Sequence, residues 1–125
     1  MEKLPKISES EWLVMQVLWS KGPLTANEVV EQLASKNKWN PRTVKTLINR
    51  LLKKGALNFQ KQGRQYRYIP AVSESKCIHK ETRSFVRRVY GGAIRPMLAA
   101  FLEDANLSAD EIKELKKILD QKGGD

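Results

Sequence analysis

The stretch WNPRTVKTLINRLLKKG, from Trp39 to Gly55, decides the fold because it contains signals for both ends and both faces of one helix. Asn40 is a favourable N-cap, Pro41 suits the first helical position, and Gly55 supplies the left-handed residue that ends many helices. Apolar residues recur at the spacing of one buried stripe. They are Val44, Leu47, Ile48, Leu51 and Leu52. The sequence therefore predicts a helix that packs one face into a core.

The remaining face of this predicted helix is polar and basic. The candidate DNA-contacting residues of the helix are Arg42, Thr43, Lys45, Thr46, Asn49, Arg50 and Lys53. Thr43 lies near the start of the helix. The forked groups of Arg and Asn can pair with guanine and adenine edges, whereas lysines reach phosphates. We expect Lys53, Lys54 and Lys36 to hold phosphates. An ordinary solvated helix has a similar pattern, and capping or packing would also explain Thr43 and Thr46.

The charge around this helix has one sign. Between Gln32 and Ser73 there are ten Lys or Arg residues and no Asp or Glu. A solvated surface normally mixes signs, and the self-repulsion of a one-sign field is offset by a polyanionic partner. The net charge of +9 is uneven, since residues 1–70 hold 13 basic and 5 acidic groups and residues 71–125 hold 10 and 9. The N-terminal part is therefore the candidate nucleic-acid binder.

Two shorter helices are predicted before this segment, and each opens with a capping box. The boxes are Ser8-Glu9-Ser10-Glu11 and Thr25-Ala26-Asn27-Glu28. The second helix is expected to end where the polar residues 35–38 break its apolar pattern. Three short helices with compact turns, the last one basic, are typical of a helix-turn-helix module.

Residues 57–70 change to a period of two around Gly63, which predicts a β-hairpin. Its expected tip is Lys61, Gln62, Gly63 and Arg64, and Lys61 and Arg64 are candidate contacts to backbone phosphates. Tyr66 and Tyr68 are expected in the core and in strand pairing rather than as base-stacking platforms. Helices followed by a hairpin make a winged helix, which we place at residues 1–71.

Residues 72–125 form the second predicted domain, a set of amphipathic helices. Ser73 can cap the first helix, Gly91-Gly92 interrupts it, and the residues from Ser108 to Glu111 form a capping box for the last. The candidate dimerisation residues are Ile94, Met97, Leu98, Phe101, Leu102, Ile112, Leu115 and Leu119. Helices of this size do not make a stable core alone, so we expect a second copy to cover them. The predicted fold is mainly α with a small β-hairpin wing and a C-terminal helical dimerisation segment.

The residues for enzyme chemistry are missing from the sequence. No HExxH, paired CxxC, Walker loop or GxSxG motif occurs. Cys77 and His79 lie two residues apart on a predicted helix and so do not face each other, and His79 is expected at the surface or in a dimer contact. No signal-peptide core or membrane-span-length apolar run occurs. We expect a cytoplasmic non-enzyme without a metal or cofactor.

Five segments of the chain resemble the penicillinase repressor (BlaI/MecI) family of winged-helix transcription repressors. They are ISESEWLVMQVLW, ANEVVEQL, WNPRTVKTLINRLLKKGAL, GRQYRYIP and LSADEIKELKKIL, in order over nearly the whole chain. The resemblance implies a homodimer that binds palindromic operators upstream of beta-lactam resistance genes and blocks transcription. It also implies a membrane-bound beta-lactam sensor with a metalloprotease domain, and cleavage of the repressor in its dimerisation segment.

The family's cleavage site aligns with Ala100 and Phe101, where this sequence has Ala in place of the family's Asn. The tail after Leu119 has no cysteine, so the C-terminal cysteine cluster of the related copper-responsive repressors is absent. Three alternatives stay open: a repressor of this family that answers another signal, a winged helix for protein interaction, and a nonspecific nucleoid or RNA binder.

Overall fold

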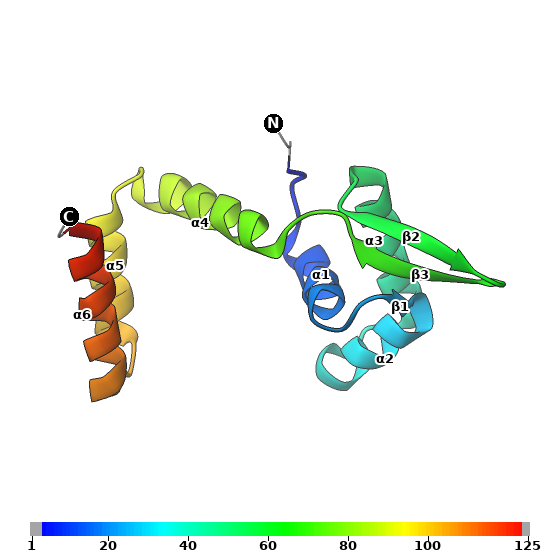
Figure 1. The fold of residues 1–125 in the computed structure, drawn as a ribbon, viewed down its shortest axis with the longest axis horizontal. Helices are drawn as coiled ribbons and strands as arrows, with labels where there is room; N and C mark the ends of the chain where they lie inside the picture. The colour runs from blue at the N-terminus through cyan, green and yellow to red at the C-terminus, as the bar shows by residue number, and fades with distance from the viewer. Residues whose placement is uncertain (1–3, 124–125) are drawn as a thin grey trace. The chain divides into compact units, whose positions relative to one another are not determined.

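The computed structural model describes residues 4–123, apart from the side chain of Lys36. Figure 1 shows the order of its helices and strands. The bounds are Glu9–Lys21 for α1, Leu24–Thr25 for β1, Ala26–Asn37 for α2, Pro41–Lys54 for α3, Leu57–Gln62 for β2, Gln65–Pro70 for β3, Glu74–Tyr90 for α4, Ile94–Asp104 for α5 and Ala109–Gly123 for α6. The chain divides into two compact units, one ending at Lys80 and one beginning at Glu81. This division falls inside α4, and the assignment of residues 1–71 and 72–125 to a DNA-binding and a dimerisation domain stays a prediction.

The predicted caps of the helices are confirmed. The Asn40 side chain accepts a hydrogen bond from the N–H of Thr43 at 3.0 Å, and Gly55 ends α3 with a φ of 82°. Reciprocal capping boxes join Ser8 with Glu11, Thr25 with Glu28 and Ser108 with Glu111. Each box satisfies backbone donors that have no partner within the helix, so the local sequence fixes where these helices begin.

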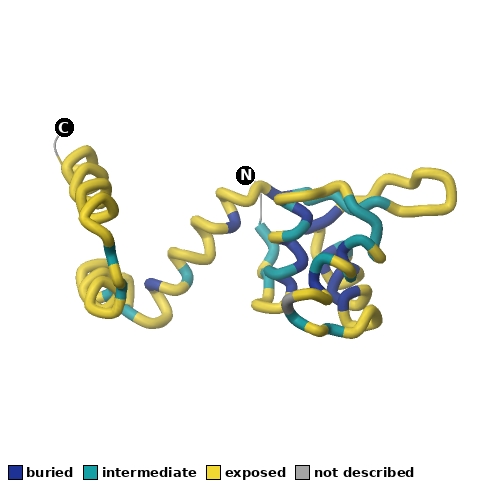
Figure 2. Tube along the Cα trace, turned by 90° about the horizontal axis from the view of Figure 1, so that it is seen from below, coloured by how far each residue is buried: buried dark blue, intermediate teal, exposed yellow. Residues whose placement is uncertain are grey.

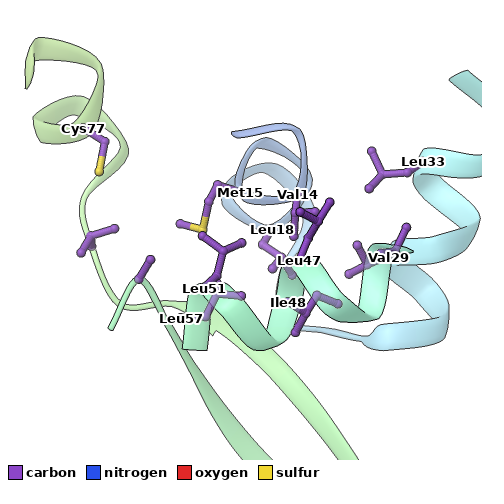
Figure 3. Close-up of a cluster of buried hydrophobic side chains, with 13 residues drawn as sticks. Val14, Met15, Leu18, Val29, Leu33, Leu47, Ile48, Leu51, Leu57 and Cys77 are labelled. Atoms are coloured by element: carbon purple, nitrogen blue, oxygen red, sulfur yellow. The ribbon is translucent and has the colours of Figure 1, made fainter. Parts of the chain in front are cut away.

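The core of the first unit is one apolar cluster where α1, α2, α3 and the sheet meet (Figure 3). Its buried members are Val14, Met15, Leu18, Val29, Leu33, Val44, Leu47, Ile48, Leu51, Ala56, Leu57, Val72 and Cys77. Four of the five stripe residues predicted for α3 belong to it, and Leu52 packs against it partly buried. Burying one Leu or Ile side chain contributes about 1.5–3 kcal/mol. The stripe therefore anchors α3 and leaves its polar face toward solvent.

The sheet has three strands among the described residues, one more than the hairpin that the sequence predicted. β1 pairs antiparallel with β3, which also pairs with β2. The hairpin turn is also shorter than expected, because Gln62 pairs with Gln65 and Lys61 lies within β2. Only Gly63 and Arg64 form the turn, and Gly63 has the positive φ, 65°, that a two-residue hairpin turn requires.

The predicted end of the second helix was wrong. α2 continues through Ser35 to Asn37 and ends at Lys38, whose φ is 52°. The Ser35 hydroxyl donates to the carbonyl of Gln32, and polar residues on a solvent-facing turn cost a helix little. Loss of the apolar pattern therefore marked where burial ends, while the backbone stayed helical for one further turn.

In the second unit, α5 and α6 present their apolar stripes to solvent. Figure 2 shows both helices almost entirely in the exposed colour, and Val86 is the one buried residue among residues 81–123. The exposed stripe residues are Ile94, Leu98, Phe101, Leu102, Ile112, Leu115 and Leu119, while Met97 is half-buried. None of the described helices is both long enough and apolar enough to cross a membrane.

Candidate nucleic-acid interface

The exposed face of α3 carries seven of the eight contact residues that were predicted on this helix. Arg42, Thr43, Lys45, Thr46, Asn49, Arg50 and Lys53 are all exposed. They lie on one face because the buried stripe occupies the other side of the same helix. The structure therefore gathers these seven side chains on one surface of the first unit, which we call the α3 face.

Thr46 differs in its bonding from the longer side chains of the α3 face. The Thr46 hydroxyl donates to the carbonyl oxygen of Arg42 at 2.9 Å, a local bond that uses its only hydrogen. Among the described residues, no hydrogen bond or ion pair engages the side chains of Arg42, Lys45, Asn49, Arg50 and Lys53. These five side chains can therefore bind a ligand without first breaking a bond within the protein.

Lys54 does not belong to this surface, contrary to the prediction that it holds a phosphate. Its Nζ lies 2.5 Å from Oε1 of Glu11 and donates to the carbonyl of Lys6 at 2.8 Å. Burial raises the pKa of Glu11, but hydrogen bonds from Lys54 and Ser8 outweigh this effect and hold the pKa below its usual range. The pair joins the end of α3 to the start of α1. The side chain of Lys36, the third predicted phosphate contact, lies outside the described residues.

The hairpin of β2 and β3 is the wing, and it adds two more exposed cations. Lys61 in β2 and Arg64 in the turn are both exposed. Arg67 is engaged within the unit, since its Nε donates to Gln62 at 2.7 Å and its Nη1 lies 3.5 Å from Oε1 of Glu28. Lys61 and Arg64 thus remain the candidate phosphate contacts of the wing.

The two tyrosines of β3 have different environments. Tyr68 packs against the core, as predicted. Tyr66 pairs with Lys61 in the hairpin, as predicted, but its assignment to the core was wrong, because it is exposed. Its ring makes an edge-to-face contact with Phe59, with ring centroids 5.0 Å apart. Phe59 and Tyr66 are both exposed, and neither ring belongs to the buried core. The period-two pattern predicted on which face of the sheet Tyr66 lies. It did not predict how far the buried core extends along that face.

In the second unit, the predicted cleavage residues Ala100 and Phe101 lie in α5 and are both exposed. In the first unit, His79 is exposed and Cys77 is buried. Within residues 4–123, no three His, Cys, Asp or Glu side chains are grouped so that they could hold a metal ion.

Three helices, a short β1 strand and a wing make the first unit a winged-helix domain, with its basic face on the helix that helix-turn-helix proteins place in the major groove. The family model for the penicillinase repressor matches residues 7–121. The penicillinase repressor of Bacillus licheniformis is 42% identical over 121 residues, which are 97% of this chain and 94% of that protein. The chain belongs to the penicillinase repressor family.

Two further comparisons agree with this family. The methicillin resistance regulatory protein MecI of Mammaliicoccus sciuri is 38% identical over 120 residues, which are 96% of this chain and 98% of that protein. The solution structure of the Bacillus licheniformis BlaI monomeric form in complex with the blaP half-operator is 44% identical and superposes with a TM-score of 0.53. That match covers 60% of this chain and 92% of the BlaI chain.

Proposed function

We propose that this chain is a DNA-binding transcription repressor of beta-lactam resistance genes that acts as a homodimer on palindromic operators. The observation that carries the proposal is the α3 face, with five long polar side chains free of internal bonds, in a chain of the penicillinase repressor family. The related BlaI structure, which holds a half-operator, supports the same partner for this chain. Because that partner is chromosomal or plasmid DNA, the proposed location is the cytoplasm.

The contacts follow from the chemistry and position of each side chain. Thr43 and Thr46 lie near the start of α3, where recognition helices meet bases, and Asn49 and Arg50 have the forked groups that read purine edges. Arg42 and Lys45 complete the proposed groove contacts. Phosphate contacts are assigned to Lys53 on α3 and to Lys61 and Arg64 on the wing.

The homodimer is proposed from the exposed stripes of α5 and α6. Leu102, Ile112, Leu115 and Leu119 line an open hollow of about 480 Å³ between these helices. Exposed apolar patches of this kind on a soluble protein mark interaction sites, and a second copy supplies the matching stripe. Two linked winged helices then contact both halves of a palindrome.

Release from DNA is proposed to follow cleavage at the Ala100–Phe101 bond, prompted by a membrane-bound beta-lactam sensor with a metalloprotease domain. The bond lies in α5, and Phe101 belongs to the proposed dimer stripe. A cut there would separate the two DNA-binding units and remove an avidity gain on the order of 100-fold. The Ala at position 100, where the family has Asn, favours a second candidate, a repressor of this family that answers another signal.

The first test is binding of the purified chain to duplex DNA from upstream of its own gene and to a scrambled duplex, across a salt series. We expect strong preference for a palindromic segment, bound by two chains. Equal affinity for both duplexes with a steep salt slope would instead indicate nonspecific nucleic-acid binding. Failure to bind either duplex at low salt would indicate a protein-interaction module.

Cleavage is tested in cells that contain the sensor, by following the size of the chain after a beta-lactam is added. We expect a cut at the 100–101 bond, and more rapid cutting of the Ala100→Asn variant. An intact chain, with repression relieved by another signal, would support the second candidate.

A further inference from the structure

We propose that a hollow between α2, α3 and β3 seats one sugar–phosphate unit of the bound duplex, held by Asn27, Lys45 and Tyr66. This inference rests on the DNA binding proposed above. It adds Asn27 and Tyr66 to the contacts, neither of which the sequence singled out as a binding residue. We call this hollow the backbone seat.

The backbone seat is formed by three elements that are distant in sequence. Its volume is about 190 Å³. It is lined by the N-cap and first two residues of α2 (25–27), by Lys45 of α3 and by Gln65, Tyr66 and Tyr68 of β3. Asn27, Lys45 and Tyr66 are all exposed, so their polar ends reach solvent. Lys45 also belongs to the α3 face, and the seat assigns the ammonium of this groove residue to a phosphate. The seat therefore continues the proposed DNA-binding surface from α3 toward the wing.

Three polar groups of the seat are donors that have no hydrogen-bond partner among the described residues. Among the described residues, no hydrogen bond or ion pair engages the amide of Asn27, the ammonium of Lys45 or the hydroxyl of Tyr66. Lys, Asn and Tyr side chains are common donors to phosphate oxygens in protein–DNA complexes. The tyrosine rings add flat apolar surface against which a deoxyribose can pack. Together these groups suit one phosphate with its sugar.

The charge of the seat also selects an anion. No carboxylate lines it, and the nearby Glu28 is engaged elsewhere, since its Oε1 accepts from the N–H of Thr25 at 2.9 Å and lies 3.5 Å from Nη1 of Arg67. The pKa of Glu28 is lowered, chiefly by the backbone hydrogen bond from Thr25. Glu28 is thus ionised at neutral pH and paired with Arg67, which leaves the charge of Lys45 uncompensated at the seat.

Two conservative variants test the seat. Tyr66→Phe removes only the hydroxyl, and Asn27→Ala removes only the amide from an exposed position near the start of α2. We expect each to weaken binding by about threefold to tenfold, the usual range for one hydrogen bond. The loss should be equal for the upstream duplex and the scrambled duplex, because a phosphate contact carries no sequence information. The matched controls, Tyr90→Phe in α4 and Asn58→Ala on the other face of β2, should bind like wild type.

A chemically altered duplex locates the phosphate. Methylphosphonate substitution, which neutralises one phosphate at a time, should reveal a position that weakens the wild type and does not weaken Tyr66→Phe further. Wild-type affinity of both variants, or a loss confined to the upstream duplex, would overturn the seat while leaving the proposed function intact. If the wild type itself binds neither duplex, the proposed function fails and the seat fails with it.

Discussion

Glu11 shows how one residue serves two purposes in this fold. Its carboxylate closes the capping box of α1 and also binds Lys54 at the end of α3, while only 1% of the residue is exposed. Glu11→Ala removes both interactions and should lower the free energy of unfolding by about 2–4 kcal/mol. Urea denaturation measures this loss. Glu31→Ala, at an exposed position of α2, is the control and should change stability little.

The lowered pKa of Glu11 gives this contribution a pH dependence of known sign. The folded state favours the ionised carboxylate, so the contribution is complete above the ordinary pKa of a glutamate. It is lost as the pH falls through the lowered pKa of the folded protein. The stability difference between wild type and Glu11→Gln should therefore shrink in acid. A difference that stays constant down to the unfolding pH would show that the ion pair contributes nothing.

Arg50 is the sharpest test of base reading on the α3 face. Arg50→Ala should lower affinity for the upstream duplex by about 1–3 kcal/mol, with a smaller loss on scrambled DNA, if the guanidinium reads a base. Titrations of both duplexes measure the two losses. Lys117→Ala removes an exposed cation from α6 and should leave both affinities unchanged. Equal losses on the two duplexes would assign Arg50 to a phosphate instead.

At the scale of the element, α3 follows almost wholly from its own sequence. Its N-cap, its left-handed stop and its buried stripe are all local signals, and all are confirmed. Asn40→Ala should cost about 1 kcal/mol of unfolding free energy, because the N–H of Thr43 loses its side-chain acceptor. Urea denaturation again measures the effect. Asn58→Ala, exposed in β2 and outside any helix, is the matched control; an equal loss in both variants would mean that the cap contributes nothing specific.

Several features that sequence reasoning missed depend on contacts between distant elements. β1 is only two residues long, too short for a period of two to be visible, and it forms because β3 offers a free edge. The local sequence does not distinguish Lys54 from its neighbour Lys53. The ion pair between Lys54 and Glu11 joins residues that are distant in the sequence. Tyr66 has the strand pattern of a core residue, yet its side chain is exposed. The α3 face was predictable from one helix, whereas the backbone seat needs three elements.

At the scale of the whole molecule, the proposed dimer interface lies in the second unit, where the apolar stripes of α5 and α6 are exposed. Leu115→Glu places a charge in the proposed dimer stripe and should yield a monomer, measured by sedimentation. Affinity for a full palindrome should then fall on the order of 100-fold, while affinity for a half-site stays the same. Lys117→Gln changes the charge by the same amount on the opposite face of α6, and it should remain dimeric. A dimeric Leu115→Glu chain would move the interface away from this stripe.

The buried core ends early in the chain, and this has a consequence for the cell. Apart from Val86, every buried apolar residue of the described chain precedes Lys80. The indole N–H of Trp19 in α1 donates to the carbonyl of Val72 at 3.0 Å, which ties the segment after β3 to α1. A cut at the 100–101 bond removes nothing from that core. Induction by such a cut would therefore leave an N-terminal fragment that stays folded and binds the operator weakly. How fully the genes switch on would then depend on the number of fragment copies in each cell, and a strain that overproduces the repressor would stay partly silenced even after every molecule had been cut.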